Sequence, residues 1–267
     1  MTTRHLVACL LAAGLVAPLA VSAQAPQAER RDRPRPLRSV GDPGRVAAAD
    51  LGLARQARDE GQWTAFRARA AAGALLHLDE GPVEGATYLA NRADPAQPVE
   101  WAPDTVWSSC DGTLAVSEGR FRQPDGLVGS YLTVWKLQGD RSYKWLYDLG
   151  GPDVPQPAPR PTRQPAPRSD GTTIAEDGSE LILVAEIPLV RGLVADCASR
   201  RNPAPPRPAA TPASSTTRAG EGSSDDGTLT WRWEHRANGE RLMVAAWLKD
   251  GAWQQVTQLR LAPTRAE

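Results

Sequence analysis

Acid–base chemistry is the first activity that particular residues of this chain suggest, through the segment HLDEGPVEG at 77–85. Asp79 follows a short apolar run, and burial against aromatic side chains would raise the pKa of its carboxyl group into the range of a general base. Tyr88 lies soon after it, and its hydroxyl group could donate a hydrogen bond to a developing oxyanion. Asp148, on a later strand, is a second carboxylate of this kind. The Asp79 segment is equally typical of an ordinary solvated turn.

The sequence lacks the residue patterns that other kinds of catalytic site require. His77 and Asp79 would share one face of a strand and could provide two metal ligands, but no cluster of histidines or cysteines provides more. The sequence contains no glycine-rich phosphate loop, no Gly-x-Ser-x-Gly and no Cys-x-x-Cys motif. Cys110 has no evident histidine beside it to activate a thiol. We therefore predict neither a metal ion nor a cofactor.

Aromatic side chains are the candidates for binding a ligand. Together they could line a cavity that accepts a flat or apolar molecule. They could equally fill the core or a dimer interface, because large rings dominate both. The candidates are Trp63, Phe66, Tyr88, Trp101, Trp107, Tyr131, Trp135 and Trp145.

Two helices, a short strand and a short helix are expected before a set of antiparallel strands. Asp42-Pro43 is typical of a helix N-cap followed by proline at the first helical position. Turn sequences then separate four strands, at about 99–109, 113–122, 127–139 and 142–150. Strand alternation predicts one shared face for Tyr131, Thr133, Trp135 and Leu137, and one for Tyr143, Trp145, Tyr147 and Leu149.

This order of elements, and the wording of two segments, resemble the NTF2-like superfamily (SnoaL-like and DUF4440-like proteins). The segments are ARDEGQWTAFRARAAAGALLHL and DTVWSSCDGTLAVSEGRFRQPDGLVGSYLTVWKLQGDRSYKWLYDLG, and the resemblance covers roughly residues 45–150. It implies an α+β cone, in which N-terminal helices pack inside a curved antiparallel sheet, and a homodimer formed through the sheet. Asp79 stands loosely where ketosteroid-isomerase relatives keep a general base. The fold hosts many activities, so it implies none in particular.

The N-terminus is typical of a secretory signal peptide. An arginine precedes an apolar run from Leu6 to about Val21, and small residues precede a cleavage site after Ala23. A membrane anchor is the alternative, but the run is short and contains Gly14 and Pro18. We therefore expect a protein that is exported, periplasmic or secreted, without a stable membrane anchor.

Cleavage would leave two cysteines, Cys110 and Cys197. Because an exported protein meets an oxidising compartment, this pair predicts one disulfide; two separate buried thiols are the alternative. The 31 Lys and Arg residues equal the 31 Asp and Glu residues, and the ordered part has no net basic character, so the sequence does not predict nucleic-acid binding.

Proline-rich stretches divide the remainder of the chain. We expect a disordered tail at 24–41, an NTF2-like domain at 42–150, a linker at 151–179, an apolar segment at 180–198 and a flexible linker at 199–227. A three-stranded meander at 228–263, with Asn-Gly and Asp-Gly turns, would dock on the sheet of the first domain or form a small independent module. The sequence shows no evident internal repeat.

Three functions remain open at this stage. The first is non-covalent binding of a small apolar or aromatic molecule, or self-association. The second is a cofactor-free lyase or isomerase with Asp79 as general base. The third is a non-enzymatic interaction module of the cell envelope, which would need a filled interior and an exposed aromatic patch.

Overall fold

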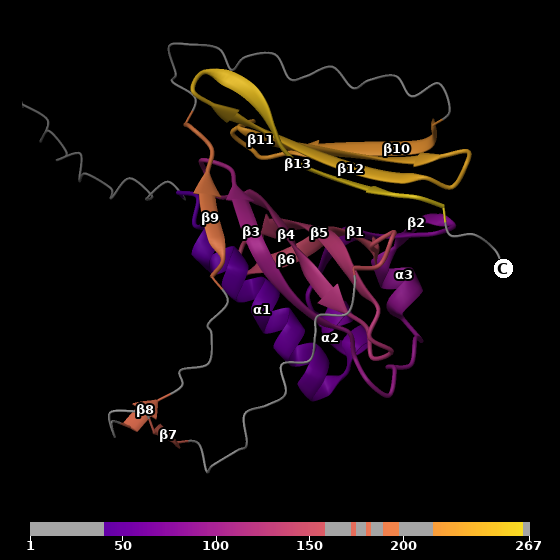
Figure 1. Cartoon of the computed structure of the whole chain (residues 1–267). Helices are drawn as coiled ribbons and strands as arrows, with labels where there is room; N and C mark the ends of the chain where they lie inside the picture. The colour runs from indigo at the N-terminus through magenta and orange to yellow at the C-terminus, as the bar shows by residue number, and fades with distance from the viewer. Residues whose placement is uncertain (1–39, 158–171, 175–179, 183–188, 198–215, 264–267) are drawn as a thin grey trace, which may run out of the picture. The chain divides into compact units, whose positions relative to one another are not determined.

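The computed structural model describes residues 40–157, 172–174, 180–182, 189–197 and 216–263 (Figure 1). The predicted signal peptide and nearly all of the predicted tail at 24–41 lie outside these residues. Within the described ranges, no helix has the length and apolar character that crossing a membrane requires.

Three helices precede or interrupt the first strands. They are α1 (Pro43–Glu60), α2 (Gln62–Ala68) and α3 (Gly85–Leu89). The α1 helix begins as the sequence predicts: Pro43 is its first residue, and the Asp42 carboxylate accepts a hydrogen bond from the backbone N–H of Arg45 at 3.2 Å. Gly61 ends α1 and has a φ of 111°, which favours glycine.

A seven-stranded mixed sheet has the order β2-β1-β6-β5-β4-β3-β9. Its strands β1 and β6 are parallel, as are β3 and β9, and the other neighbours are antiparallel. The strands are β1 (Ala70–Leu78), β2 (Gly81–Glu84), β3 (Glu100–Ser108), β4 (Leu114–Arg122), β5 (Val128–Leu137), β6 (Tyr143–Pro152) and β9 (Arg191–Val194).

A second sheet is a four-stranded antiparallel meander, β10-β11-β12-β13, and β7 pairs with β8 in a short ribbon (Figure 1). The strands are β7 (Thr172–Ile174), β8 (Glu180–Ile182), β10 (Thr216–Ser223), β11 (Leu229–Arg236), β12 (Arg241–Lys249) and β13 (Ala252–Leu261).

The predicted fold is therefore wrong. A cone of helices inside a curved antiparallel sheet with a three-stranded appendage does not describe a chain that is mostly β, with a seven-stranded mixed sheet and a separate four-stranded sheet. The sequence did not predict that strands far apart in the chain pair with each other. Strand β9 pairs in parallel with β3, although more than 80 residues of chain separate the two, and it extends the sheet. Such pairing leaves no local signal in the sequence.

Strand β10 lies inside the predicted flexible linker at 199–227, and β7 lies inside the predicted linker at 151–179. The β10 segment TTRAGEGS lacks the alternating large apolar residues of a typical strand. Its small residues are required by the neighbouring strand: a Cβ atom at Gly220 would lie 2.6 Å from the indole nitrogen of Trp233, and one at Gly222 would lie 2.6 Å from that of Trp231. The glycines thus make room for two large rings.

Two apolar cores lie on opposite faces of the seven-stranded sheet. One contains α1 and α2 side chains with Trp135 and Trp145, and the other contains Val134 and Tyr147 with side chains of the four-stranded sheet. Burial of the apolar side chains in these two cores is the main favourable contribution to folding. The four-stranded sheet is therefore packed on the first sheet, one of the two arrangements expected from the sequence.

A bulge in β6 decides which side chains face which core. The β5–β6 pairing shifts between Val134, which lies opposite Tyr147, and Trp135, which lies opposite Trp145. The extra residue in β6, Leu146, reverses which face of the sheet the following side chains of that strand point to. Tyr143 and Trp145 therefore belong to the helix-side core, while Tyr147 and Leu149 belong to the core between the sheets. The prediction that these four share one face is wrong for this reason.

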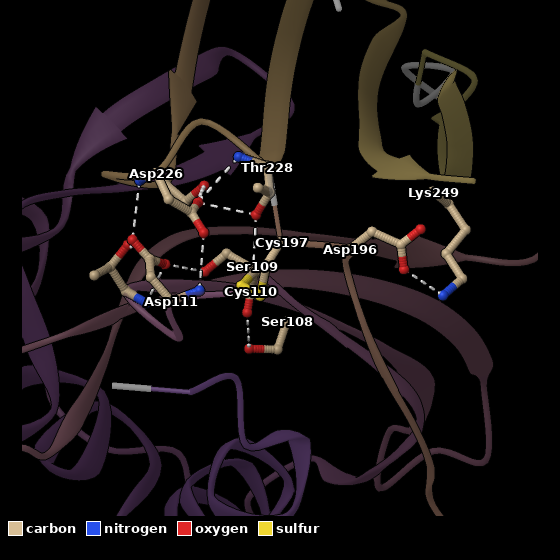
Figure 2. The surroundings of a disulfide bond; sticks show 11 residues. Ser108, Ser109, Cys110, Asp111, Asp196, Cys197, Asp226, Thr228 and Lys249 are labelled. Carbon is tan, nitrogen blue, oxygen red and sulfur yellow. Dashed lines mark hydrogen bonds and ion pairs between the residues drawn. A yellow bond between two sulfur atoms is a disulfide. The ribbon is translucent and has the colours of Figure 1, made fainter. Parts of the chain in front are cut away.

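The predicted disulfide joins Cys110, in the turn after β3, to Cys197, just after β9 (Figure 2). The two Cα atoms are 5.1 Å apart, an ordinary distance for a disulfide. Asp196, next to it, forms an ion pair with Lys249 at 2.7 Å and accepts a backbone hydrogen bond from Asp250 at 2.6 Å. This segment therefore connects the two sheets.

Candidate functional site

A cavity of about 400 Å³ lies on the helix side of the seven-stranded sheet. A volume of this size suits a small organic molecule. Its lining comes from α1, α2, α3 and five strands of the first sheet, with one residue, Arg241, from the four-stranded sheet.

Aromatic rings form one wall of the cavity. Those of Trp63 and Phe66 on α2 are 6.0 Å apart at their centroids, and Phe66 is 5.7 Å from Trp101 on β3. Tyr88 on α3 lies edge-on to Trp63 at 6.3 Å. These edge and tilted arrangements suit the charge distribution of the rings. They leave apolar surface toward the cavity, which favours a flat ligand.

Asp148 is an acidic group of the cavity lining with a strongly raised pKa. Burial raises the pKa of its carboxyl group from 3.8 to about 7, a hydrogen bond from the Thr133 hydroxyl group at 2.7 Å opposes this, and the nearby Asp50 charge adds to it. The β6 bulge turns this side chain toward the helices. A carboxyl group with a pKa near neutrality can both accept and return a proton.

Asp50 lies behind the same wall and is 1% exposed. Its carboxylate accepts hydrogen bonds from the Ser117 hydroxyl at 2.7 Å, the Trp101 indole N–H at 2.9 Å and the Tyr131 hydroxyl at 3.1 Å. Burial raises its pKa to about 6 although all three bonds oppose the shift. Burial and the Asp50 charge raise the pKa of Tyr131 well above 10, so the phenol stays protonated. The network fixes Tyr131 and Trp101 in the cavity wall.

The rim of the cavity carries an ion pair between Asp79 and Arg241 at 2.5 Å. The Asp79 side chain is 45% exposed, whereas that of Arg241 is 6% exposed. Arg241 also donates to the backbone carbonyl of His77 at 3.4 Å, and its Nε has no hydrogen-bond partner among the described residues. Burial lowers the pKa of Arg241, an effect that Asp79 opposes. The guanidinium group remains a cation, because its pKa is normally above 12.

His77 is buried between the two sheets. Its Nδ1 lies 2.5 Å from the Tyr147 hydroxyl and its Nε2 lies 3.2 Å from Nδ1 of His235. Burial and the charges of His235, Arg241 and Arg218 lower the pKa of His77 to about 3, so this side chain is neutral at ordinary pH. No group of three His, Cys, Asp or Glu side chains that could hold a metal ion occurs among the described residues.

The structure brings together five of the eight aromatic residues predicted to line a cavity, and it places three elsewhere. Trp107 faces the core between the sheets, and Trp135 and Trp145 are fully buried on the helix side. The five that line the cavity are Trp63, Phe66, Tyr88, Trp101 and Tyr131. Tyr88 is also stacked against the Arg92 guanidinium group at 4.3 Å.

Asp79 does not meet the condition on which its predicted role depends. A general base at this position needed burial against aromatic rings, but the side chain is largely exposed and paired with Arg241. Asp148, the other carboxylate considered from the sequence, does lie in the cavity wall.

Asp50 and Arg241 were not found from the sequence. The sequence could have indicated Asp50, since it falls on the buried apolar stripe of α1 formed by Val46, Ala47, Leu53 and Ala54. An acidic residue in such a stripe must be hydrogen-bonded. Nothing in the sequence indicated Arg241 as a site residue, because only the packing of the second sheet brings β12 to this cavity.

No known protein-family model matches the chain, and no curated protein matches it. The resemblance of residues 45–150 to the NTF2-like superfamily stays a prediction. Any function must therefore be argued from the cavity itself.

Proposed function

We propose that this protein binds a small, flat, largely apolar molecule in the cavity beneath α2 and α3. The observation that carries the proposal is the cavity of about 400 Å³ with an aromatic wall formed by Trp63, Phe66 and Trp101. An interaction module with a filled interior fits this cavity less well. The Cys110–Cys197 disulfide is compatible with an exported protein, and we propose export to the periplasm or the medium as the setting.

The polar groups of the lining suggest how a ligand is oriented. Arg241 is a buried cation at the rim with one N–H group unpartnered in the described part of the chain. Its guanidinium group would attract an anionic or carbonyl-bearing end of the ligand. Asp148 and Thr133 lie in the wall formed by β5 and β6. The preferred ligand is therefore an aromatic molecule with one acidic or strongly polar substituent.

A pair of fluorescent probes tests this proposal. Anilinonaphthalene sulfonate and its uncharged analogue phenylnaphthylamine share their rings and differ in the sulfonate group. Both should bind with one site per chain in a titration followed by fluorescence. Val99→Trp, which places a ring into the cavity lining, should abolish binding of both. The matched control is Val154→Trp, because Val154 is 82% exposed and outside the lining. Equal binding by the two variants would contradict the proposal.

The role of Arg241 is tested with the same probes. Arg241→Gln should weaken the sulfonate probe about tenfold or more, since a hydrogen bond to a charged group contributes roughly 1.5–3 kcal/mol, and should leave the uncharged probe unaffected. Arg241→Lys, which keeps the charge, should recover part of the loss. A uniform effect on both probes would mean that Arg241 acts through the shape of the cavity alone.

Proton transfer is a second candidate function, and the near-neutral pKa of Asp148 favours it. A base in this wall could remove a proton next to a carbonyl group and return it elsewhere, as a lyase or isomerase does. Deuterium exchange at such carbons, followed by NMR for a panel of aromatic ketones, would reveal the activity. Asp148→Asn should abolish the exchange, whereas Asp79→Asn should not. Exchange that survives in Asp148→Asn would refute this role.

A further inference from the structure

Two turns far apart in the chain have nearly the same sequence, which corrects the expectation that the chain has no internal repeat. Residues 108–114 read SSCDGTL and residues 223–229 read SSDDGTL, so that only Cys110 and Asp225 differ. The first turn links β3 to β4 and the second links β10 to β11. The glycine of each, Gly112 and Gly227, has a φ of 70°.

Each turn is held by the same internal hydrogen bonds. In the first, Oδ1 of Asp111 accepts from the Ser109 hydroxyl at 2.7 Å and from both the N–H and the hydroxyl of Thr113 at 2.9 Å. In the second, Oδ1 of Asp226 accepts from the Ser224 hydroxyl at 2.7 Å and from the N–H and hydroxyl of Thr228 at 3.0 and 2.9 Å. The two turns therefore have one structure.

The two turns also bind each other reciprocally, as Figure 2 shows for the two aspartates. The backbone N–H of Asp111 donates to Oδ2 of Asp226 at 2.9 Å, and the N–H of Asp226 donates to Oδ2 of Asp111 at 2.9 Å.

The threonines of the two turns form a second reciprocal pair of hydrogen bonds, which they accept from the residues just before the two aspartates. The N–H of Cys110 donates to the Thr228 hydroxyl oxygen at 2.9 Å, and the N–H of Asp225 donates to that of Thr113 at 3.0 Å. Identical patches that contact each other through equivalent residues are the pattern of a two-fold interface between two copies of one protein.

The equivalence extends through the strands that follow. Val116 pairs with Val134 on β4 and β5, and Trp231, at the equivalent place on β11, pairs with Ala245 on β12. The next pairing has a bulge in both sheets, directly after Val134 in one and directly after Ala245 in the other. A bulge at the same position is a specific feature, because bulges are retained within families of related sheets.

From these observations we infer that β10–β13 is a second copy of β3–β6, and that it serves as a built-in partner of the first. The two copies meet as two identical chains would, and their facing side chains form one core that includes Val116, Val134, Trp231 and Ala245. The face that a homodimer would use is therefore occupied within the chain. The homodimer implied by the family resemblance is replaced by pairing inside one molecule.

Unfolding by urea tests this inference on the full chain. Asp111→Asn and Asp226→Asn each replace the Oδ2 atom by an NH₂ group, which cannot accept the N–H of the opposite turn. Each should raise the unfolding equilibrium constant about tenfold or more, since the lost bond involves a charged acceptor. The two effects should agree within a factor of about three, because the contacts are equivalent.

The matched control is Asp140→Asn. Asp140 accepts hydrogen bonds from the backbone N–H and the hydroxyl group of Ser142, within its own turn, and is exposed. Its substitution should change the equilibrium constant less than either of the others. All proteins should be measured at low and at high protein concentration. Pairing within one chain gives midpoints that do not depend on concentration, whereas pairing between chains raises them with concentration.

Two results would overturn the inference. One is a wild-type midpoint that rises with concentration while those of the two asparagine variants do not, because the turns would then pair between copies. The other is a large effect of one variant and an effect no larger than that of Asp140→Asn for the other. If the asparagine variants do not fold, Thr113→Val and Thr228→Val make the same comparison, since each removes one equivalent acceptor.

Discussion

Changing Asp148 to Asn should stabilise the protein at high pH. Burial raises the pKa of this carboxyl group from 3.8 to about 7. Between these values the carboxyl group holds a proton in the folded state that it has lost in the unfolded state, so the contribution of Asp148 to the free energy of unfolding falls as pH rises. Asparagine has no proton to lose and keeps an oxygen for the Thr133 hydroxyl group. The variant should therefore escape this loss.

The size of this stabilisation follows from the pKa shift of Asp148. A change of roughly three pKa units corresponds to about 4 kcal/mol at 1.36 kcal/mol per unit. Because Asp148 lines a cavity and is only partly buried, we expect about 2–4 kcal/mol. The stability of Asp148→Asn relative to wild type should rise by this amount between about pH 4 and pH 8, and then level off.

Urea unfolding followed by tryptophan fluorescence measures this difference. Each pair of proteins is compared at the same pH, so that other titrating groups cancel. Asp79→Asn is the control, because its exposed side chain has little desolvation to relieve. A difference between Asp148→Asn and wild type that does not change from about pH 4 to pH 8 would refute the argument that Asp148 is desolvated.

Two further predictions concern the space between the sheets and the disulfide. His77 is neutral in the folded state because burial and the facing groups His235, Arg241 and Arg218 lower its pKa to about 3. Relative to His77→Gln, the wild type should therefore lose about 1 kcal/mol of stability per pH unit as pH falls from about 6.5 toward 3, measured by acid unfolding followed by circular dichroism. An acid limb with the same slope in both proteins would contradict this. Replacing Cys110 and Cys197, which are 87 residues apart, by serine should cost about 4 kcal/mol or less in urea unfolding; no measurable cost would mean that the loop is already closed by other contacts.

Local physical chemistry makes several features of this protein predictable from sequence. The helix start at Asp42-Pro43 follows from backbone sterics and capping, and it is observed. The Cys110–Cys197 bond was predicted from the two cysteines that lie outside the predicted signal peptide, and it is observed. The face of β5 that carries Tyr131 and Trp135 follows from strict alternation, which holds along that strand.

The candidate site depended on features with no local signature. The β6 bulge brings Asp148 to the helix side, and a one-residue irregularity cannot be seen in the apolar pattern, since Tyr143, Trp145, Tyr147 and Leu149 alternate perfectly in the sequence. The fold itself was mispredicted for a similar reason: β9 and β10 form only because distant strands offer them partners.

The sequence by itself determined the turns, the first helix, the cysteine pair and the aromatic residues from which a cavity could be made. Only the tertiary structure decided which of those rings surround a cavity, that Asp50 and Asp148 are desolvated beside it, and that Arg241 reaches its rim. The physical reason is that turns and caps are set by a few neighbouring residues. Burial and pKa are set by everything that packs around a group, much of which comes from distant parts of the chain.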